Sequence, residues 1–322
     1  MLLIDSPVLV HLGKLPLDHP FTTAMAHELG VPTKVLHELV VLGVLRRPVR
    51  TGYVNAEIPD TLALRVALLE LVVPPGCFVA DHTAAWLHAG DKALLPNAHL
   101  TVPKPDIFRH SKTRALRNPL VRSGERAVRA DDLIVIGGIE ATTPLRTACD
   151  LGRLFHRDVA MWGLSCMLGT ETFDINELFS MLPRFRRERG VVQLRALAPL
   201  ADKDLQSFGE AGLLNRWHDA GLPRPRCQIP IVLNGRVIFW LDMGLEDLHF
   251  AAEYDGAEWH DGDDAEEHDA GRREWMETQR NWWIEVFRGP SVFGGQQDAD
   301  ARLRSAYAAL RRAGAARSHL IL

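Results

Sequence analysis

Cysteine is scarce in this chain of 322 residues, and the spacing of the few present excludes two common scaffolds of small domains. The four cysteines lie far apart and form no CxxC pair; they are Cys77, Cys149, Cys166 and Cys227. This pattern argues against a zinc ribbon or a disulfide framework and is typical of a protein in a reducing cytoplasm. Internal repeats and low-complexity segments are missing too.

Long apolar runs are absent as well. The run at 134–139 has the length of a strand, and no stretch approaches the roughly 18 uncharged apolar residues of a membrane span. The N-terminal segment MLLIDSPVLVHLGK lacks the basic start and the long apolar core of a signal peptide. We therefore expect a cytoplasmic protein with no membrane partner.

A surplus of positive charge is the third absence. Lys and Arg number 37 against 41 Asp and Glu, which gives a net charge of −4. The protein as a whole is therefore not a basic nucleic-acid coat, and any contact with nucleic acid must come from local patches. The composition, 47% hydrophobic and 24% charged, is that of a globular protein long enough for two or three domains.

Residues 20–55 contain two short helical patterns followed by a basic hairpin. Hydroxyl side chains at 22–23 can cap a first helix that ends at Gly30, and Thr33 can cap a second helix that ends at Gly43. Two short strands then flank a group of arginines. This order is typical of a winged helix-turn-helix, which binds DNA or, less often, another protein.

The start of the second helix and the hairpin supply the expected DNA contacts. A recognition helix presents its first residues to base edges, and a basic wing can grip phosphates. The side chains expected to contact bases are Thr33, Lys34 and His37. The side chains expected to contact phosphates are Arg46, Arg47 and Arg50.

The middle of the chain alternates helical and strand patterns. Helices are predicted at 62–73 and 81–87, and strands at 100–102 and 133–136. Between these strands, residues 104–129 carry eight Lys or Arg against two acids. This basic stretch either contacts DNA phosphates or forms a solvated edge.

The last part of the chain is acidic and has a clear order of elements. Between Glu246 and Glu274 there are twelve acids and two arginines. An Asn234-Gly235 pair between apolar runs predicts a hairpin, and the whole predicts a sheet covered by helices. The expected order is helix 204–220, strands 227–233, 236–243 and 249–255, helix 266–281, strand 283–288 and helix 296–313.

Three acids in this part are candidates for a metal site. Asp242 ends a predicted strand, and Glu253 and Asp255 lie two apart on the next strand, so that both project to one side. Converging carboxylates repel one another unless a cation neutralises them, and carboxylate oxygens suit Mg²⁺. Such an ion can generate hydroxide and stabilise a phosphodiester transition state.

The motifs SFGE at 207–210, AEYDG at 252–256 and WWIEVFR at 282–288, with Asp242 and Arg272-Arg273, resemble a family related to very-short-patch-repair endonucleases. That family is a branch of the PD-(D/E)XK nucleases, and the resemblance covers about 203–312. It implies a magnesium-dependent phosphodiesterase. The matching positions are Asp242 and Glu253 for the metal carboxylates, Glu210 for the helix acid and Asp255 where the wider superfamily often has lysine. His260, five residues after Asp255, can act as a proton donor or acceptor or as an outer partner of the metal.

Residues 21–54 resemble the winged-helix domain of AbiEi-type antitoxins, which repress type IV toxin–antitoxin operons. The motifs ADHTAAWLH at 80–88 and ATTPLRTACD at 141–150 resemble the domain that follows it in those antitoxins. This resemblance implies DNA and a cognate toxin as partners.

We expect an α/β (α+β) protein of three domains. They are a winged helix-turn-helix at 1–58, a mixed α/β middle domain at 59–202, and a restriction-endonuclease-like sheet flanked by helices at 203–322. The leading hypothesis is a DNA-binding protein with a Mg²⁺-dependent endonuclease domain. The alternatives are a non-catalytic AbiEi-like repressor with a degenerate nuclease fold, favoured by the missing lysine, and a structural protein that binds a protein through its wing.

Overall fold

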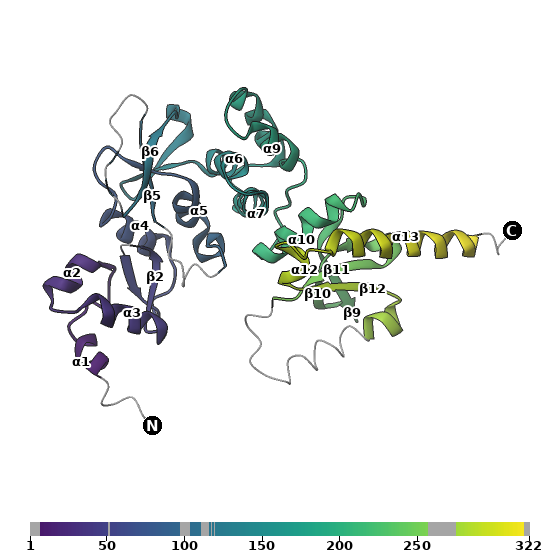
Figure 1. Ribbon diagram of the computed structural model, residues 1–322, viewed down its shortest axis with the longest axis horizontal. Coiled ribbons are helices and arrows are strands. Elements are labelled where there is room, and N and C mark those ends of the chain that lie inside the picture. Colours follow the sequence, from purple (N-terminus) through teal and green to yellow (C-terminus); the bar gives the residue numbers. More distant parts are fainter. Residues whose placement is uncertain are drawn as a thin grey trace. The chain divides into compact units, whose positions relative to one another are not determined.

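The computed structural model describes residues 7–50, 52–96, 104–110, 116, 118, 120–256 and 275–318. Within these residues the chain is a mixed α/β protein with three separate sheets, which confirms the expected mixture of helices and strands (Figure 1). No helix of the described part is long and apolar enough to cross a membrane. The chain divides into two compact units: an N-terminal unit, 1–151 with 166–184, and a C-terminal unit, 152–165 with 185–322.

The first sheet of the N-terminal unit has three strands, in the order β1-β3-β2. The hydroxyl of Thr22 caps α2 by accepting a hydrogen bond from the Met25 N–H at 3.2 Å. Gly30, shortly after the end of that helix, has a positive φ of 73°. Phe21 stacks on Tyr53 in the core, with ring centroids 5.6 Å apart. The elements are α1 (Pro7–Leu12), β1 (Phe21–Thr22), α2 (Thr23–Glu28), α3 (Thr33–Val41), β2 (Leu45–Val49) and β3 (Gly52–Asn55).

The expectation that Thr33 caps the second helix is wrong. The carbonyl of Pro32 already accepts the N–H groups of Val35 and Leu36, so α3 begins directly after Pro32. Thr33 is therefore the first residue of the helix, and its hydroxyl lies 2.8 Å from Nε2 of His27 instead.

The second sheet of the N-terminal unit has five strands, in the order β6-β5-β4-β8-β7. The helix expected at 62–73 is observed, and the Thr61 hydroxyl caps it by accepting the Leu64 N–H at 3.2 Å. The strand expected at 133–136 is observed, whereas the one at 100–102 lies outside the described residues. The elements here are α4 (Leu62–Glu70), β4 (Phe78–Val79), α5 (Asp81–Ala89), η1 (Gly90–Ala93), β5 (Asp106–His110), β6 (Arg122–Arg126), η2 (Ala130–Asp132), β7 (Leu133–Ile136) and β8 (Ile139–Thr142).

Helices follow this sheet along the chain. Pro144 begins the first of them, because proline is tolerated in the first turn of a helix. They are α6 (Pro144–Leu154), α7 (Arg157–Leu168), α8 (Ile175–Met181), η3 (Leu182–Phe185) and α9 (Val191–Leu197).

The C-terminal unit contains a four-stranded sheet in the order β12-β11-β10-β9. Neighbouring strands are antiparallel except β11 and β12, which are parallel. The predicted order of elements is confirmed, and residues 275–280 are the described part of the helix expected at 266–281. The elements are α10 (Phe208–Asp219), β9 (Arg226–Leu233), β10 (Arg236–Leu245), η4 (Glu246–Leu248), β11 (Phe250–Tyr254), β12 (Trp283–Phe287), α12 (Gly289–Val292) and α13 (Ala299–Ser318).

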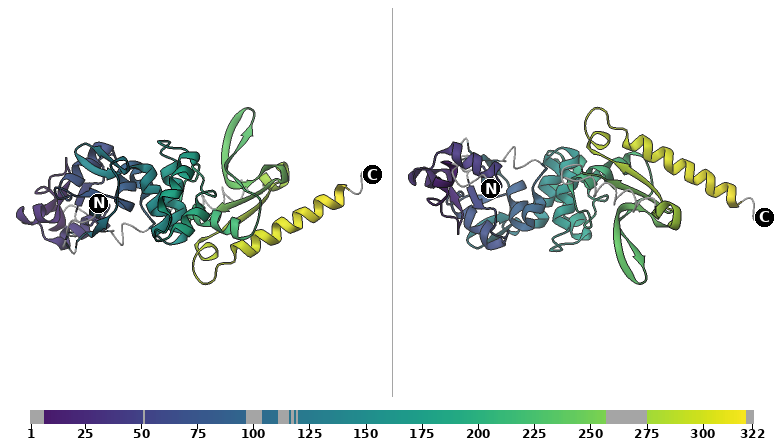
Figure 2. Two further views of the ribbon diagram at one scale, coloured as in Figure 1. Left: turned by 90° about the horizontal axis from the view of Figure 1, so that it is seen from above. Right: turned by 90° about the horizontal axis from the view of Figure 1, so that it is seen from below.

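The Asn234-Gly235 turn is observed as predicted. It joins Leu233 to its partner Arg236, and both turn residues have positive φ, 52° and 77°. Positive φ at both positions is the geometry of a type I′ turn, for which Asn-Gly is the preferred pair. Figure 2 shows the resulting β9–β10 hairpin, in green, extending beyond the rest of its sheet.

Helix α10 packs closely against β11, and this packing fixes the position of the first turn of the helix. Gly209 meets the ring of Tyr254, where a Cβ atom would clash, and Trp217 stacks on Phe250 with ring centroids 5.5 Å apart. Arg302 of α13 lies over the Phe287 ring at 4.3 Å. Aromatic contacts of this kind attach both helices to the sheet.

Candidate functional site

The register of β10 and β11 brings Asp242 and Glu253 to neighbouring positions. Met243 pairs with Ala252 in this antiparallel ladder. One step further along the same register, Asp242 faces Glu253. Residues directly opposite in an antiparallel pair have Cβ atoms about 4.5–5.5 Å apart. The two acids expected to converge therefore occupy adjacent positions on two strands.

Asp242 lies within a strand, and the expectation that it ends one is wrong. β10 continues to Leu245 because Gly244 has no side chain to collide with the carbonyl of Phe250 on β11. The Oδ2 atom of Asp242 accepts the backbone N–H of Tyr254 at 2.7 Å. The carboxylate is thus held in the sheet, directly beside the last residues of β11.

Glu253 is only 6% exposed, so its carboxylate is almost removed from bulk water. Mg²⁺ binds through one or two protein carboxylates and completes its shell with water and substrate phosphate, so the pair Asp242 and Glu253 fits this ion. Within the described residues, no group of three or more His, Cys, Asp or Glu side chains could hold a metal, which limits the fit to two carboxylates.

Glu210 is buried in the first turn of α10. Its Oε2 atom accepts the Gln206 N–H at 2.9 Å and the side-chain amide of Gln228 at 3.1 Å. The start of a helix favours a negative charge. Gln228 lies on β9 at the position that faces Asp242, between two observed pairs of the β9–β10 ladder. The sequence analysis did not single out this glutamine. Its place beside Asp242 follows from the strand register, and its unusual backbone, with a positive φ of 51°, is visible only in the structure.

Asp255 is engaged by an arginine. It follows the last residue of β11, and its N–H donates to the Phe287 carbonyl at 2.8 Å. Its Oδ2 atom accepts hydrogen bonds from Nε and Nη2 of Arg288, at 3.0 and 2.9 Å. The position where the nuclease superfamily has lysine thus carries an acid bound to arginine. His260 lies outside the described residues.

The three side chains expected to contact bases share one exposed helix surface. Thr33, Lys34 and His37 are all exposed in the first turns of α3. Lys34 lies 4.0 Å from Glu38, a loose pair that leaves 87% of the lysine side chain exposed. The structure therefore brings these three residues together at the start of α3.

The hairpin arginines contact the protein itself. Arg46 donates to Asp91 of η1 at 2.8 Å and to the carbonyl of Ile58 at 2.7 Å. The guanidinium of Arg47 lies over the ring of Tyr53 at 5.0 Å and donates to the carbonyl of Arg50. These contacts fix the hairpin in place, and all three arginines are half-buried.

A network of ion pairs around buried acids links the five-stranded sheet to α5, η2, η3 and α6, and it was not foreseen from the sequence. Arg146 donates to Asp132 at 2.7 Å and to Asp150 at 2.9 Å. Arg122 and Arg126, from the basic stretch at 104–129, both donate to the buried acid Asp81, although Arg122 itself stays exposed. The members are Asp81, Asp106, Asp132 and Asp150 with Arg122, Arg126, Arg146 and Arg184.

Burial changes the acidity of groups around this network. Burial raises the pKa of Asp106 to about 6, although Arg122 acts in the opposite direction. Burial also lowers the pKa of His82 to about 4, and the charge of Arg122 lowers it further. His82 is therefore neutral at pH 7.

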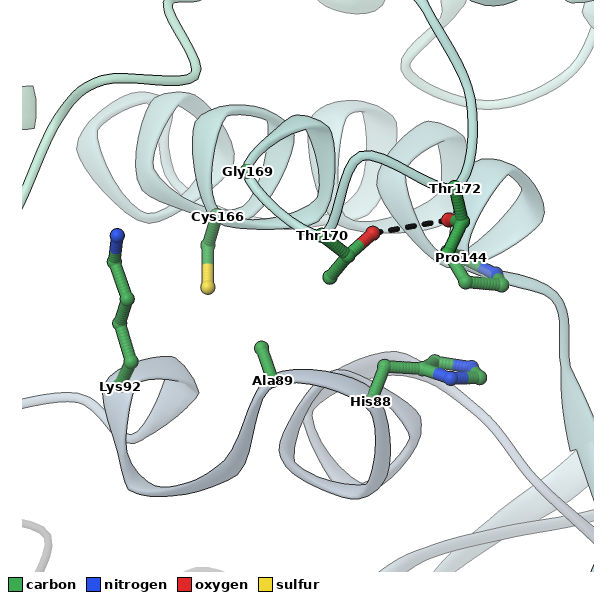
Figure 3. A pocket seen from close by; sticks show the side chains of 8 residues that line it. All are labelled: His88, Ala89, Lys92, Pro144, Cys166, Gly169, Thr170 and Thr172. Atoms are coloured by element: carbon green, nitrogen blue, oxygen red, sulfur yellow. Dashed lines mark hydrogen bonds between the residues drawn. The ribbon is translucent and has the colours of Figure 1, made fainter. Parts of the chain in front are cut away.

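A pocket of about 330 Å³ lies in the N-terminal unit (Figure 3). Cys166 faces it, and burial raises the pKa of this thiol to about 11, so it is protonated and a poor nucleophile at pH 7. The four cysteines form no disulfide, as the sequence pattern indicates, and all four are buried. The lining residues are His88, Ala89, Lys92, Pro144, Cys166, Gly169, Thr170 and Thr172.

The described residues thus define a mixed α/β protein with a pair of acids on adjacent strands of its C-terminal sheet. No protein-family model matches the chain. It is 30% identical over 211 residues to the uncharacterized protein Rv2248 of Mycobacterium tuberculosis strain ATCC 25618 / H37Rv, covering 66% of this chain and 74% of that one. The same figures hold for the uncharacterized protein MT2308 of strain CDC 1551 / Oshkosh. The chain belongs to the family of these mycobacterial proteins.

Proposed function

We propose that this protein binds DNA and that its C-terminal unit hydrolyses phosphodiester bonds with Mg²⁺. The observation that carries the proposal is the adjacency of Asp242 and Glu253 across β10 and β11. It is supported by the resemblance of this region to the very-short-patch-repair branch of the PD-(D/E)XK nucleases. The order of helix, three strands, helix and strand is consistent with that fold.

The residues of the site have separate roles in this proposal. Asp242 and Glu253 would hold Mg²⁺, which would supply an activated water and stabilise the charge of the transition state. The hydrogen bond from Tyr254 N–H orients the Asp242 carboxylate. Glu210 fixes the amide of Gln228, which faces Asp242 on β9.

The N-terminal unit would bring the site to DNA as a winged helix-turn-helix. The exposed start of α3 supports this role, because Thr33, Lys34 and His37 can reach base edges or phosphates from one surface. The wing would act as a rigid support, since Arg46 and Arg47 are engaged by the protein.

Nicking of supercoiled plasmid tests this function. We expect cleavage in Mg²⁺ that stops in chelator and falls at least about a hundredfold in Asp242→Ala and Glu253→Ala, the usual order of loss for a group that stabilises transition-state charge. Asp247→Ala, which removes an exposed acid of η4, is the matched control and should cleave normally. Cleavage that persists in both site variants would reject the assignment.

A second candidate is a repressor of the AbiEi antitoxin type that keeps the nuclease fold without cleavage. The acid at position 255, where the nuclease superfamily has a lysine, favours it. An adjacent reading frame for a nucleotidyltransferase-like toxin, together with sequence-specific binding and no nicking in Mg²⁺, would support this role and a toxin as partner.

A further inference from the structure

We propose that Arg288 is a phosphate-binding residue of the C-terminal site and that Asp255 positions it. The proposal rests on the proposed nuclease function and adds the group that receives the scissile phosphate. β11 and β12 are parallel, and Tyr254 pairs with Phe287. Asp255 and Arg288 therefore leave the sheet side by side at its carboxyl edge, where open α/β sheets bind ligands. Glu253 lies near this same end of β11, and Asp242 lies opposite it on β10.

The geometry of the pair fixes the guanidinium without burying it. Nε and Nη2 of Arg288 both donate to one oxygen of Asp255, while 59% of the arginine side chain is exposed. An arginine has five donors in a planar fork that matches the oxygens of a phosphate. A guanidinium oriented in this way can receive a phosphate on its exposed side.

The charges of the site give this arginine a function. Asp242, Glu253 and Asp255 are three acids within one sheet edge, and their negative charge repels a DNA backbone. A bound cation would offset part of this charge, and Arg288 adds a fixed positive group for the phosphate. The pair Asp255 and Arg288 thereby replaces a single lysine.

The simpler explanation is an ordinary surface ion pair, and the same sheet offers a control. Arg226 donates to Glu246 at 2.7 Å, and its side chain is 55% exposed. This second pair lies level with the start of β11, at the other end from Asp255. Arg226 of β9 pairs with Gly244 of β10, which pairs with Ala251 near the start of β11, and Glu246 directly follows β10. The two arginines are thus similarly exposed, and they lie at different distances from Asp242 and Glu253: Arg288 close to the two acids and Arg226 far from them.

Equilibrium binding of the full chain to a fluorescent duplex of about 30 base pairs in chelator, over a range of NaCl concentrations, tests the inference. Arg288→Ala should weaken binding about three- to tenfold and reduce the slope of log K against log salt by about one. Arg288→Lys should keep the slope, and Arg226→Ala should change neither quantity. Asp255→Lys combined with Arg288→Ala should restore both the slope and any cleavage.

The outcomes separate this inference from the proposed function. Unchanged affinity and slope in Arg288→Ala would overturn the inference, while metal-dependent nicking lost in Asp242→Ala would leave the nuclease intact. A reduced slope in Arg288→Ala supports the phosphate contact, whether or not the wild type nicks DNA. Absence of nicking by the wild type in Mg²⁺ would reject the nuclease function and leave the phosphate contact standing. Should Arg288→Ala misfold by circular dichroism, the double variant decides: a slope below wild type in the folded double variant overturns the inference.

Discussion

Buried carboxylates next to the five-stranded sheet and next to the four-stranded sheet accept hydrogen bonds from different donors. Asp132 of η2 and Asp150 of α6, beside the five-stranded sheet, accept hydrogen bonds from Arg146. Beside the four-stranded sheet, the buried Glu210 of α10 accepts a hydrogen bond from the Gln228 amide, and the half-buried Asp242 of β10 accepts one from the Tyr254 N–H. An arginine donor offsets the charge of the acid that it binds, whereas an amide donor orients a carboxylate and adds no charge of its own. The two kinds of contact lead to different predictions for stability and for cation binding.

The largest effect should follow from removing an arginine of the buried network. Arg146 is about 5% exposed, and Arg146→Met leaves Asp132 and Asp150 buried without this partner. We expect a loss of about 3–5 kcal/mol in the free energy of unfolding. Urea denaturation measures it, and hydrogen exchange locates it in the N-terminal unit.

Arg129→Met is the matched control, since Arg129 is exposed beside the same network. Its expected cost is below about 0.5 kcal/mol. Similar losses in Arg146→Met and Arg129→Met would mean that the buried pairs add no more than a surface arginine does.

The pH dependence of stability is the next effect. The pKa of His82 is about 4 in the folded protein, below its ordinary value of 6.5. Between these values the unfolded chain binds a proton at this histidine that the folded chain does not, so the stability that His82 contributes is greatest above about pH 6.5 and is lost toward pH 4. The contribution of His82 is at most about 3 kcal/mol, and His82→Gln should remove it.

Stability curves of the two units, followed by hydrogen exchange from pH 7 to pH 4, check this expectation. Burial lowers the pKa of His218 in the C-terminal unit to about 4 as well. His82→Gln should therefore flatten the curve of the N-terminal unit and leave that of the C-terminal unit as steep as before. An unchanged slope in the N-terminal unit would contradict the assignment to His82.

The smallest effect concerns Mg²⁺ and the four-stranded sheet. A ligand at ten times its dissociation constant stabilises the folded state by about 1.4 kcal/mol. We expect a shift of this size in the thermal unfolding of the C-terminal unit, and none in Asp242→Ala or Glu253→Ala. Asp247→Ala should keep the shift. A Mg²⁺ shift that survives in both site variants would move the cation elsewhere in the chain.

Local signals in the sequence predicted most of the elements. The Asn234-Gly235 turn, the cap at Thr22 and the glycine at the end of α2 each act over a few residues, and all are observed. The adjacency of Asp242 and Glu253 was also predictable, because a short connection joins their strands. The cap at Thr33 was predicted wrongly, since the hydroxyl residue follows Pro32, whose carbonyl already begins the helix.

Contacts between distant residues were not predictable in the same way. Arg184 bonds Asp132 across 52 positions, and Arg46 bonds Asp91 across 45. From the sequence these arginines have the pattern of exposed basic residues, because charge is visible in a sequence whereas burial and pairing are not. Arg288 and Asp255 were missed as a pair for this reason, although each belongs to a motif that the sequence analysis singled out.

Pro230 has a consequence for how the protein behaves at high concentration. It lies in β9 opposite Trp240, and among the described strands β9 has a neighbour on one side only. Such a strand can join the strand of another molecule, and Val232 and Trp240 add exposed apolar surface to the hairpin. Proline has no N–H to donate, so β9 offers one hydrogen bond fewer to an incoming strand. Pro230 therefore reduces the tendency of β9 to pair with a strand of another molecule and so to aggregate.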